Sequence, residues 1–126
     1  MGSIAEGERN KMLDAWAGRT TYTANAGVFV KLHLGDPGAA GTSNAAANTT
    51  RQAATFGSAA ATGAISNTSA IEWVSVPNTE TYSHVSFWTA STAGTFLGSD
   101  DLSSTAAVTA GDTFRIPTGD LDVSVT

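Results

Sequence analysis

Residues 28–34 read Val-Phe-Val-Lys-Leu-His-Leu, and this stretch indicates the fold class. Its even-numbered positions are all Val or Leu, whereas its odd-numbered positions hold Phe, Lys and His. A period of two places the two sets on opposite faces of a strand. We therefore expect a half-buried strand with the even positions inward. The following Gly-Asp-Pro-Gly of residues 35–38 predicts a turn.

Further short stretches of strand character follow at intervals of roughly 8 to 12 residues, which is typical of an antiparallel sandwich or barrel. We expect seven to nine strands in a mainly β, antiparallel β-sandwich. A parallel sheet is disfavoured because no second helix is available as a crossover. The expected strands beyond the first are residues 51–56, 64–66, 71–76, 82–90, 95–99, around 108, 114–116 and 121–125.

Residues 3–17 predict one N-terminal α-helix. Ser3 and Glu6 have the spacing of a capping box, and Gly18 is a plausible end. So short a helix is marginal without packing, so its apolar face must dock onto something. We therefore divide the chain into a docking helix, residues 1–18, and a β-sandwich domain, residues 19–126. The residues that share the apolar face are Ala5, Arg9, Met12, Leu13 and Trp16.

The composition excludes several classes of protein. Only 13% of the residues are charged, the net charge is −5 and the pI is about 4.6, so nucleic-acid binding is not expected. There is no Cys, which removes disulfides and thiolate chemistry. No apolar run of about 18 residues is present, and the polar, acidic start is unlike a signal peptide. We expect a soluble protein made inside the cell, without a membrane partner.

Small side chains dominate the chain: Ala, Thr, Ser and Gly together make up more than half of it. Such residues contribute little burial free energy, while ordering costs about 1 to 2 kcal/mol per residue for the backbone alone. We expect an isolated copy to be modestly stable and to gain stability from neighbouring copies. Residues 38–50 contain no large apolar side chain and predict an exposed, mobile loop, and residues 57–63 a second small-residue stretch.

The candidate catalytic and metal-binding residues favour structural interpretations. Ser83 and His84 are adjacent on a strand and should point to opposite faces, so we do not expect them to form a nucleophile–base pair. His33 and His84 are expected to be ordinary half-buried sheet histidines. Two histidines without a clear third ligand disfavour a zinc site. The Gly-rich stretches match neither phosphate-binding pattern. We expect no catalytic residue and no cofactor.

The acidic residues allow a calcium hypothesis, since carboxylate oxygens are the ligands that Ca²⁺ prefers. They lack the fixed intervals of a calcium-binding loop, so solvated turn and edge positions are the preferred interpretation. A two-carboxylate glycosidase is less favoured still, because the chain offers little pocket wall. The residues concerned are Asp36, Asp100, Asp101, Asp120 and Asp122.

An aromatic group allows a sugar-binding hypothesis. Phe87 and Trp88 are adjacent, so one should point inward and the other outward, where it could stack on a sugar or contact a neighbouring subunit. We prefer a core role with one interface contact over a sugar platform. The other members of the group are Trp73 and Tyr82.

Five segments together resemble a family of small virion proteins of tailed bacteriophages and prophages, particularly those of actinobacterial hosts. Members are described as tail-fibre-like or minor tail proteins, and the likeness covers almost the entire chain. It implies a structural role in the particle and carries over no catalytic residue. The segments are NKMLDAW (10–16), LHLGDPG (32–38), RQAATF (51–56), SHVSFW (83–88) and AGDTFRIPTGDLDV (110–123).

We therefore expect a bacteriophage virion structural protein, and the preferred role is a minor tail component assembled in multiple copies. The alternatives are a decoration or cement protein of the phage head and a carbohydrate-binding module for host adsorption. Its partners are expected to be other virion proteins, of the tail or the major capsid, and further copies of itself. The candidate interface residues are Met12, Leu13 and Trp16, together with the exposed member of the Phe87–Trp88 pair.

Overall fold

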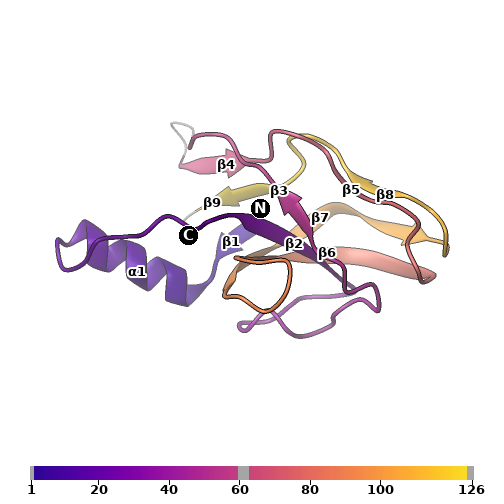
Figure 1. Ribbon diagram of the computed structural model, residues 1–126, viewed down its shortest axis with the longest axis horizontal. Helices are drawn as coiled ribbons and strands as arrows, with labels where there is room; N and C mark the ends of the chain where they lie inside the picture. Colours follow the sequence, from indigo (N-terminus) through magenta and orange to yellow (C-terminus); the bar gives the residue numbers. More distant parts are fainter. Residues whose placement is uncertain (1, 60–62, 125–126) are drawn as a thin grey trace.

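The computed structural model describes residues 2–59 and 63–124. In these ranges nine strands form two sheets, and there is one helix (Figure 1). The expected mainly β, sandwich-like fold with one N-terminal helix is confirmed. Val125, placed in the last expected strand, lies outside the described residues. The elements are β1 (Gly2–Ile4), α1 (Glu6–Trp16), β2 (Val28–His33), β3 (Gln52–Ala54), β4 (Ala64–Ser66), β5 (Ile71–Trp73), β6 (Glu80–Trp88), β7 (Phe96–Val108), β8 (Phe114–Ile116) and β9 (Asp122–Ser124).

The larger sheet, which we call the main sheet, has the strand order β3-β2-β6-β7-β1-β9-β4. The small sheet pairs β5 with β8. Neighbouring strands run antiparallel, except that β1 runs parallel to β9. The main sheet curls until its two edges meet, where Phe56 and Asn67 form an antiparallel bridge. Close by, the Gly57 amide donates to the Ser66 carbonyl over 3.1 Å.

The core lies between the curled main sheet and the small sheet. The ring centroids of Trp73 and Phe114 in the small sheet lie 5.7 Å apart, and those of Phe114 and Tyr82 of β6 lie 5.1 Å apart. Val30 and Leu32 of β2 are fully buried, as the alternation predicts. These side chains are part of the core that a chain dominated by small residues builds from its few large apolar groups.

The alternation fails at the end of β2. His33, predicted to face outward, is fully buried, and Leu34, predicted to face inward, is 46% exposed. The strand ends at His33, and the chain that follows folds back over this face of the sheet, where Ala45 forms a bridge with His33. A covering loop, which no local pattern reveals, therefore decides the burial of both side chains.

The loop of residues 38–50 is packed onto the sheet, so the expectation of an exposed loop is wrong in part. Ala46 and Asn48 are each 3% exposed. The Glu80 carboxylate accepts hydrogen bonds from the Ala47 amide (2.6 Å) and the Asn48 amide (3.2 Å). A carboxylate on a distant strand thus helps to hold a segment that lacks large apolar side chains.

One long strand replaces two short ones that the sequence predicted. The expected strands at 95–99 and around 108 are parts of β7, which runs alongside β6 over its whole length. Its second half contains small residues with weak strand character, such as Ala106 and Ala107. Backbone pairing with β6 therefore maintains an extended conformation that the side chains alone do not specify.

The N-terminal segment also differs from the prediction. Ser3 pairs with Ser99 of β7 instead of capping the helix, and α1 begins at Glu6 with Ala5 as its N-cap and no side-chain cap. The Ala5 amide donates to the Leu97 carbonyl at 2.8 Å, so pairing with β7 continues to the helix start. At the other end the predicted stop is confirmed, because Gly18 follows Trp16 and the C-cap with φ +77°.

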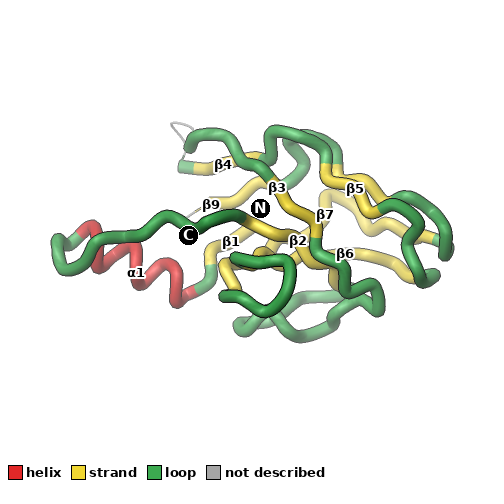
Figure 2. The backbone as a smooth tube through the Cα atoms, viewed as in Figure 1, coloured by secondary structure: helices red, strands yellow, loops and turns green. Residues whose placement is uncertain are grey.

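Helix α1 projects from the sheets as an arm (Figure 1). Residues 17–27 have no helix or strand and run back beside α1 to reach β2, as Figure 2 shows. We call residues 6–27 the arm.

Candidate functional site

The outer surface of α1 carries the most exposed large apolar side chains of the arm. Trp16 is 87% exposed and Leu13 is 61% exposed. Met12 is half-buried and points toward the sheets. The three predicted residues therefore do not form one docked face, since α1 extends beyond the body and leaves its last turn in solvent.

A buried carboxylate fastens the arm together. Glu8 is 3% exposed, and its two oxygens accept hydrogen bonds from Lys11 Nζ (2.8 Å) and from the Tyr22 hydroxyl (2.7 Å). Burial raises the pKa of Glu8, but the hydrogen bonds from Lys11 and Tyr22 outweigh it and hold the pKa below its ordinary value. Burial and the neighbouring carboxylate raise the pKa of Tyr22 to about 12. Sequence reasoning missed this contact, because Tyr22 lies outside the helical pattern.

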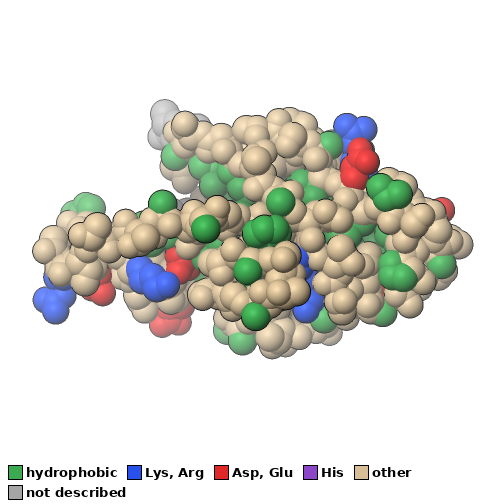
Figure 3. Space-filling view, viewed as in Figure 1, with side chains coloured by type: hydrophobic (Ala, Val, Ile, Leu, Met, Phe, Trp, Pro, Cys, Tyr) green, Lys and Arg blue, Asp and Glu red, His purple; other side chains and the backbone are tan. Residues whose placement is uncertain are grey.

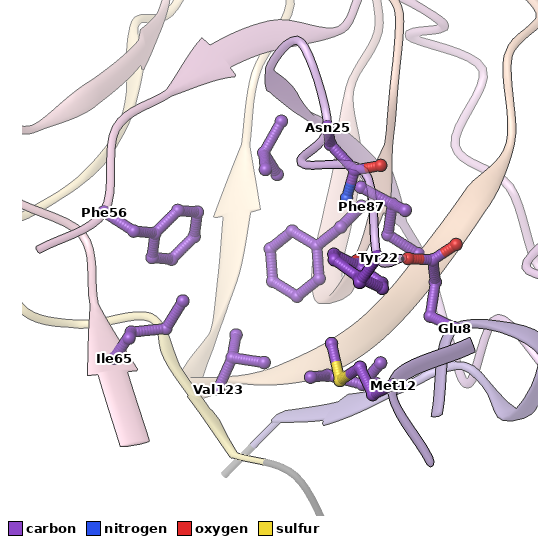
Figure 4. Close-up of a pocket in the computed structure, with 11 residues that line it drawn as sticks. Glu8, Met12, Tyr22, Asn25, Phe56, Ile65, Phe87 and Val123 are labelled. Atoms are coloured by element: carbon purple, nitrogen blue, oxygen red, sulfur yellow. Dashed lines mark hydrogen bonds between the residues drawn. The ribbon is translucent and has the colours of Figure 1, made fainter. Parts of the chain in front are cut away.

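An apolar cavity of about 160 Å³ lies where the arm meets the main sheet. In the close-up, Glu8 and Asn25 lie at one side and Phe56, Ile65 and Val123 at the other (Figure 4). Met12 reaches this cavity from α1, so one of the predicted residues contacts the chain's own sheet. The lining comprises Ile4, Glu8, Met12, Tyr22, Asn25, Val28, Phe56, Ile65, Phe87, Leu97 and Val123.

The aromatic group does not form a surface platform. Trp73, Tyr82, Phe87 and Trp88 are all buried, with Phe87 3% and Trp88 9% exposed. The expectation that Phe87 or Trp88 is exposed is therefore wrong. A register shift occurs between these two residues, and the Arg51 guanidinium covers Trp88 at 4.4 Å from the ring centroid.

His33 belongs to a buried hydrogen-bond network, not to a half-buried sheet surface. Its Nδ1 lies 2.8 Å from the Ser43 carbonyl, and its Nε2 lies 2.7 Å from Ser86 Oγ. Because a carbonyl only accepts, Nδ1 carries the proton and Nε2 of the neutral ring accepts from Ser86. Trp88 Nε1 in turn donates to Ser86 Oγ over 2.7 Å. Burial lowers the pKa of His33.

Ser83 and His84 do meet, contrary to the expectation from strand geometry. Ser83 Oγ and His84 Nδ1 form a hydrogen bond of 2.8 Å. The register between β6 and β7 shifts between Tyr82 and His84, so the two side chains do not follow a regular alternation. The geometric argument that separated these two side chains is therefore wrong.

The aspartates have different surroundings. Asp100 is 4% exposed, so it is not the solvated edge residue that we expected, and burial raises its pKa to about 7, with a further contribution from neighbouring Asp101. Asp122 accepts a hydrogen bond from Ser66, and exposed Asp36 accepts one from the Gly38 amide (2.9 Å). Within residues 2–59 and 63–124, no three His, Asp or Glu side chains are grouped so that they could hold a metal ion.

The molecular surface matches the composition. In Figure 3 uncharged polar side chains and backbone cover most of the visible face, with Lys and Arg on the arm and beside the central loops. Among the described residues, no helix has the length and apolar character to cross a membrane. This surface is suited to close packing against other protein surfaces, since few charges must be desolvated.

Comparison with known proteins identifies the family. No curated protein matches the chain. A family model described as "Podophage GP4 fiber I protein gp80" matches residues 3–124, which covers both sheets and the arm. The family is one of structural phage fibre proteins and not of enzymes. The chain belongs to this family, and is thus a tail-fibre-like structural component of a phage virion.

Proposed function

We propose that this protein is a minor tail component, present in multiple copies and attached to another virion protein through the outer surface of α1. The observation that carries the proposal is the exposure of Trp16 and Leu13 on a helix that projects from the body. Side chains of this size are frequent anchors at protein interfaces, and Trp is among the residues most enriched there. Neither side chain is buried against the described part of the protomer, which supports a partner on another chain.

The virion partners follow from the family. Association with other virion proteins is what a phage fibre protein requires. A head decoration protein would share the sandwich-like fold, so copy number distinguishes the two roles: hundreds of copies in a particle favour the head and a few to dozens the tail. The sugar-binding alternative loses its support, because the aromatic residues assigned to it are buried.

Point variants test the docking role better than removal of the segment, because residues 2–4 belong to the main sheet. We expect Trp16→Ser and Leu13→Ser to abolish or strongly reduce incorporation into particles, measured by quantitative mass spectrometry of purified virions. Their free energies of unfolding should change by less than about 0.5 kcal/mol, since both side chains are exposed.

Val74→Ser is the matched control. Val74 is 70% exposed, but it lies next to β5, away from the arm. Incorporation of this variant at the parental level, with loss of the two helix variants, supports the proposal. Normal incorporation of the helix variants would contradict it.

A further inference from the structure

Strand β1 occupies an interior position in the main sheet. Ser3 and Ile4 pair with Ser99 and Gly98 of β7, and on the other side Gly2 pairs in parallel with Val123 of β9. Without β1, the facing edges of β7 and β9 would each lose their backbone partners. The main sheet is therefore complete only when a strand fills this slot.

The slot is shaped for β1. A Cβ on Gly98 would lie 2.3 Å from the Ser3 carbonyl oxygen, which is too close for any side chain. A Cβ on Gly2 would lie 2.9 Å from the Cβ of Asp100. These two glycines allow the close approach of the strands, so the slot selects residues 2–4 in this register over an arbitrary strand.

The segment that connects α1 to β2 is suited to placing β1 in the sheet of another copy. Residues 17–27 contain no helix or strand, and most of their side chains are exposed. An extended chain spans at most about 3.3 to 3.6 Å per residue, so this segment reaches on the order of 35 Å once the hydrogen bond from Tyr22 to Glu8 is released. That distance is comparable to the diameter of a small domain.

We propose that residues 2–16 are exchanged between copies, so that β1 of one copy completes the main sheet of a second copy. This inference rests on the proposed function, which requires multiple copies in one particle. Exchange preserves every backbone pair of the slot, because the two copies have the same sequence. The favoured state is therefore decided by the connection and by the new contacts between copies.

Engineered disulfides test the exchange, because the chain has no cysteine. Ser3 and Ser99 are directly opposite across β1 and β7, so the Ser3→Cys/Ser99→Cys variant joins the strand to its slot. We expect the oxidised, purified variant to migrate on a non-reducing denaturing gel as covalent dimers or larger species. Migration as monomers alone would overturn the proposal.

The matched control is Glu72→Cys/Arg115→Cys, which joins opposite residues of β5 and β8 within one copy. Both native side chains are exposed, so random cross-linking is at least as easy there. The control should stay monomeric, and equal multimer yields in both variants would overturn the proposal.

Single variants provide a second measurement. Ser3→Cys and Ser99→Cys chains, one carrying a size tag, are unfolded, mixed, refolded and oxidised together. A covalent heterodimer joining the tagged and untagged chains supports exchange, and its absence overturns it. These measurements use purified protein, so they can fail while Trp16→Ser still abolishes incorporation, and the two proposals remain distinguishable.

Discussion

The imidazole of His33 shows how burial acts on a protonation state. The neutral ring donates from Nδ1 to Ser43 and accepts at Nε2 from Ser86, and burial lowers its pKa below 6.5. The unfolded chain takes up the proton near pH 6.5, whereas the folded chain takes it up at lower pH. The stability that His33 contributes is therefore present above pH 6.5 and is lost as the pH falls toward the folded-state pKa.

Asp100 affects the pH dependence of stability in the opposite direction to His33. Burial raises its pKa from 3.8 to about 7 in the folded protein. The folded state therefore holds a proton that the unfolded state has released. Its contribution to stability is complete below pH 3.8 and is lost as the pH rises through about 7. In the parent protein the two residues partly cancel over the range they share.

We predict that Asp100→Asn raises the free energy of unfolding at pH 8 by about 1 to 3 kcal/mol, because the ionised carboxylate is replaced by a neutral group of similar shape. At pH 4.5 the gain should be much smaller. Urea denaturation at both pH values measures the difference. Asp120→Asn is the control, since Asp120 is exposed; equal gains at the two pH values would contradict the assignment.

The same variant isolates the contribution of His33. With Asp100 replaced, we predict that the free energy of unfolding decreases as the pH is lowered from 7 to 5. The reason is that the unfolded chain binds a proton at His33 before the folded chain does. Denaturation curves at half-unit pH intervals give the slope, and a flat profile would exclude His33 as the titrating group.

Among the elements, the loop of residues 38–50 depends on distant side chains. The Glu80 carboxylate accepts from the Ala47 and Asn48 amides, and at the loop's end Arg51 donates to the carbonyls of Ala90 (2.9 Å) and Ala93 (2.7 Å). The loop's own composition predicts mobility. Two ionised side chains instead connect it to the sheet and to the β6–β7 turn.

We predict that Glu80→Ala releases this loop, because the partly buried Asn48 amide and the exposed Ala47 amide lose their acceptor, and the buried amide alone costs about 1 to 3 kcal/mol. Arg51 then becomes a trypsin site, so cleavage after residue 51 should accelerate at least tenfold. Glu72→Ala, which removes an exposed carboxylate 3.8 Å from Arg115, is the control and should leave the cleavage rate unchanged. Unchanged cleavage in Glu80→Ala would show that the loop is held by other contacts.

The prediction of the elements was most successful where a pattern and a burial requirement agreed. β2 and β8 were located correctly because their bulky residues recur with a period of two, and the short strand expected at residues 64–66 coincides with β4. The start of α1 was misplaced because Ser3 fits both a helix-capping position and a strand position. Pairing with β7 satisfies the backbone donor and acceptor of Ser3 together with those of its neighbours, so the strand position is the one adopted. A local motif does not show whether a residue caps a helix or pairs with a distant strand.

For the whole molecule, the combination of small side chains and few charges predicts a protein stabilised by its neighbours. The net charge is −5, so copies repel one another weakly at physiological ionic strength. The exposed surface of α1 is the feature of the structure through which association would stabilise the fold, and the proposed exchange of β1 would add to it.

We predict that the thermal midpoint of the purified protein rises by several degrees over a hundredfold increase in concentration, as expected when association is linked to folding. Differential scanning calorimetry measures the midpoint. Trp16→Ser should reduce the dependence on concentration, whereas Val74→Ser should not. A midpoint independent of concentration would indicate that the folded monomer is stable by itself.

The sequence by itself determined the mainly β class, the single helix with its end at Gly18, the low surface charge and the family resemblance. These properties depend on local periodicity, composition and motifs that each segment carries alone. Only the tertiary structure decided which side chains are exposed: it buried His33, Asp100 and Trp88 and left Trp16 in solvent. The reason is physical, since burial depends on what packs above a residue, and the covering loop, the curled sheet and the projecting arm are all set by contacts between distant parts of the chain.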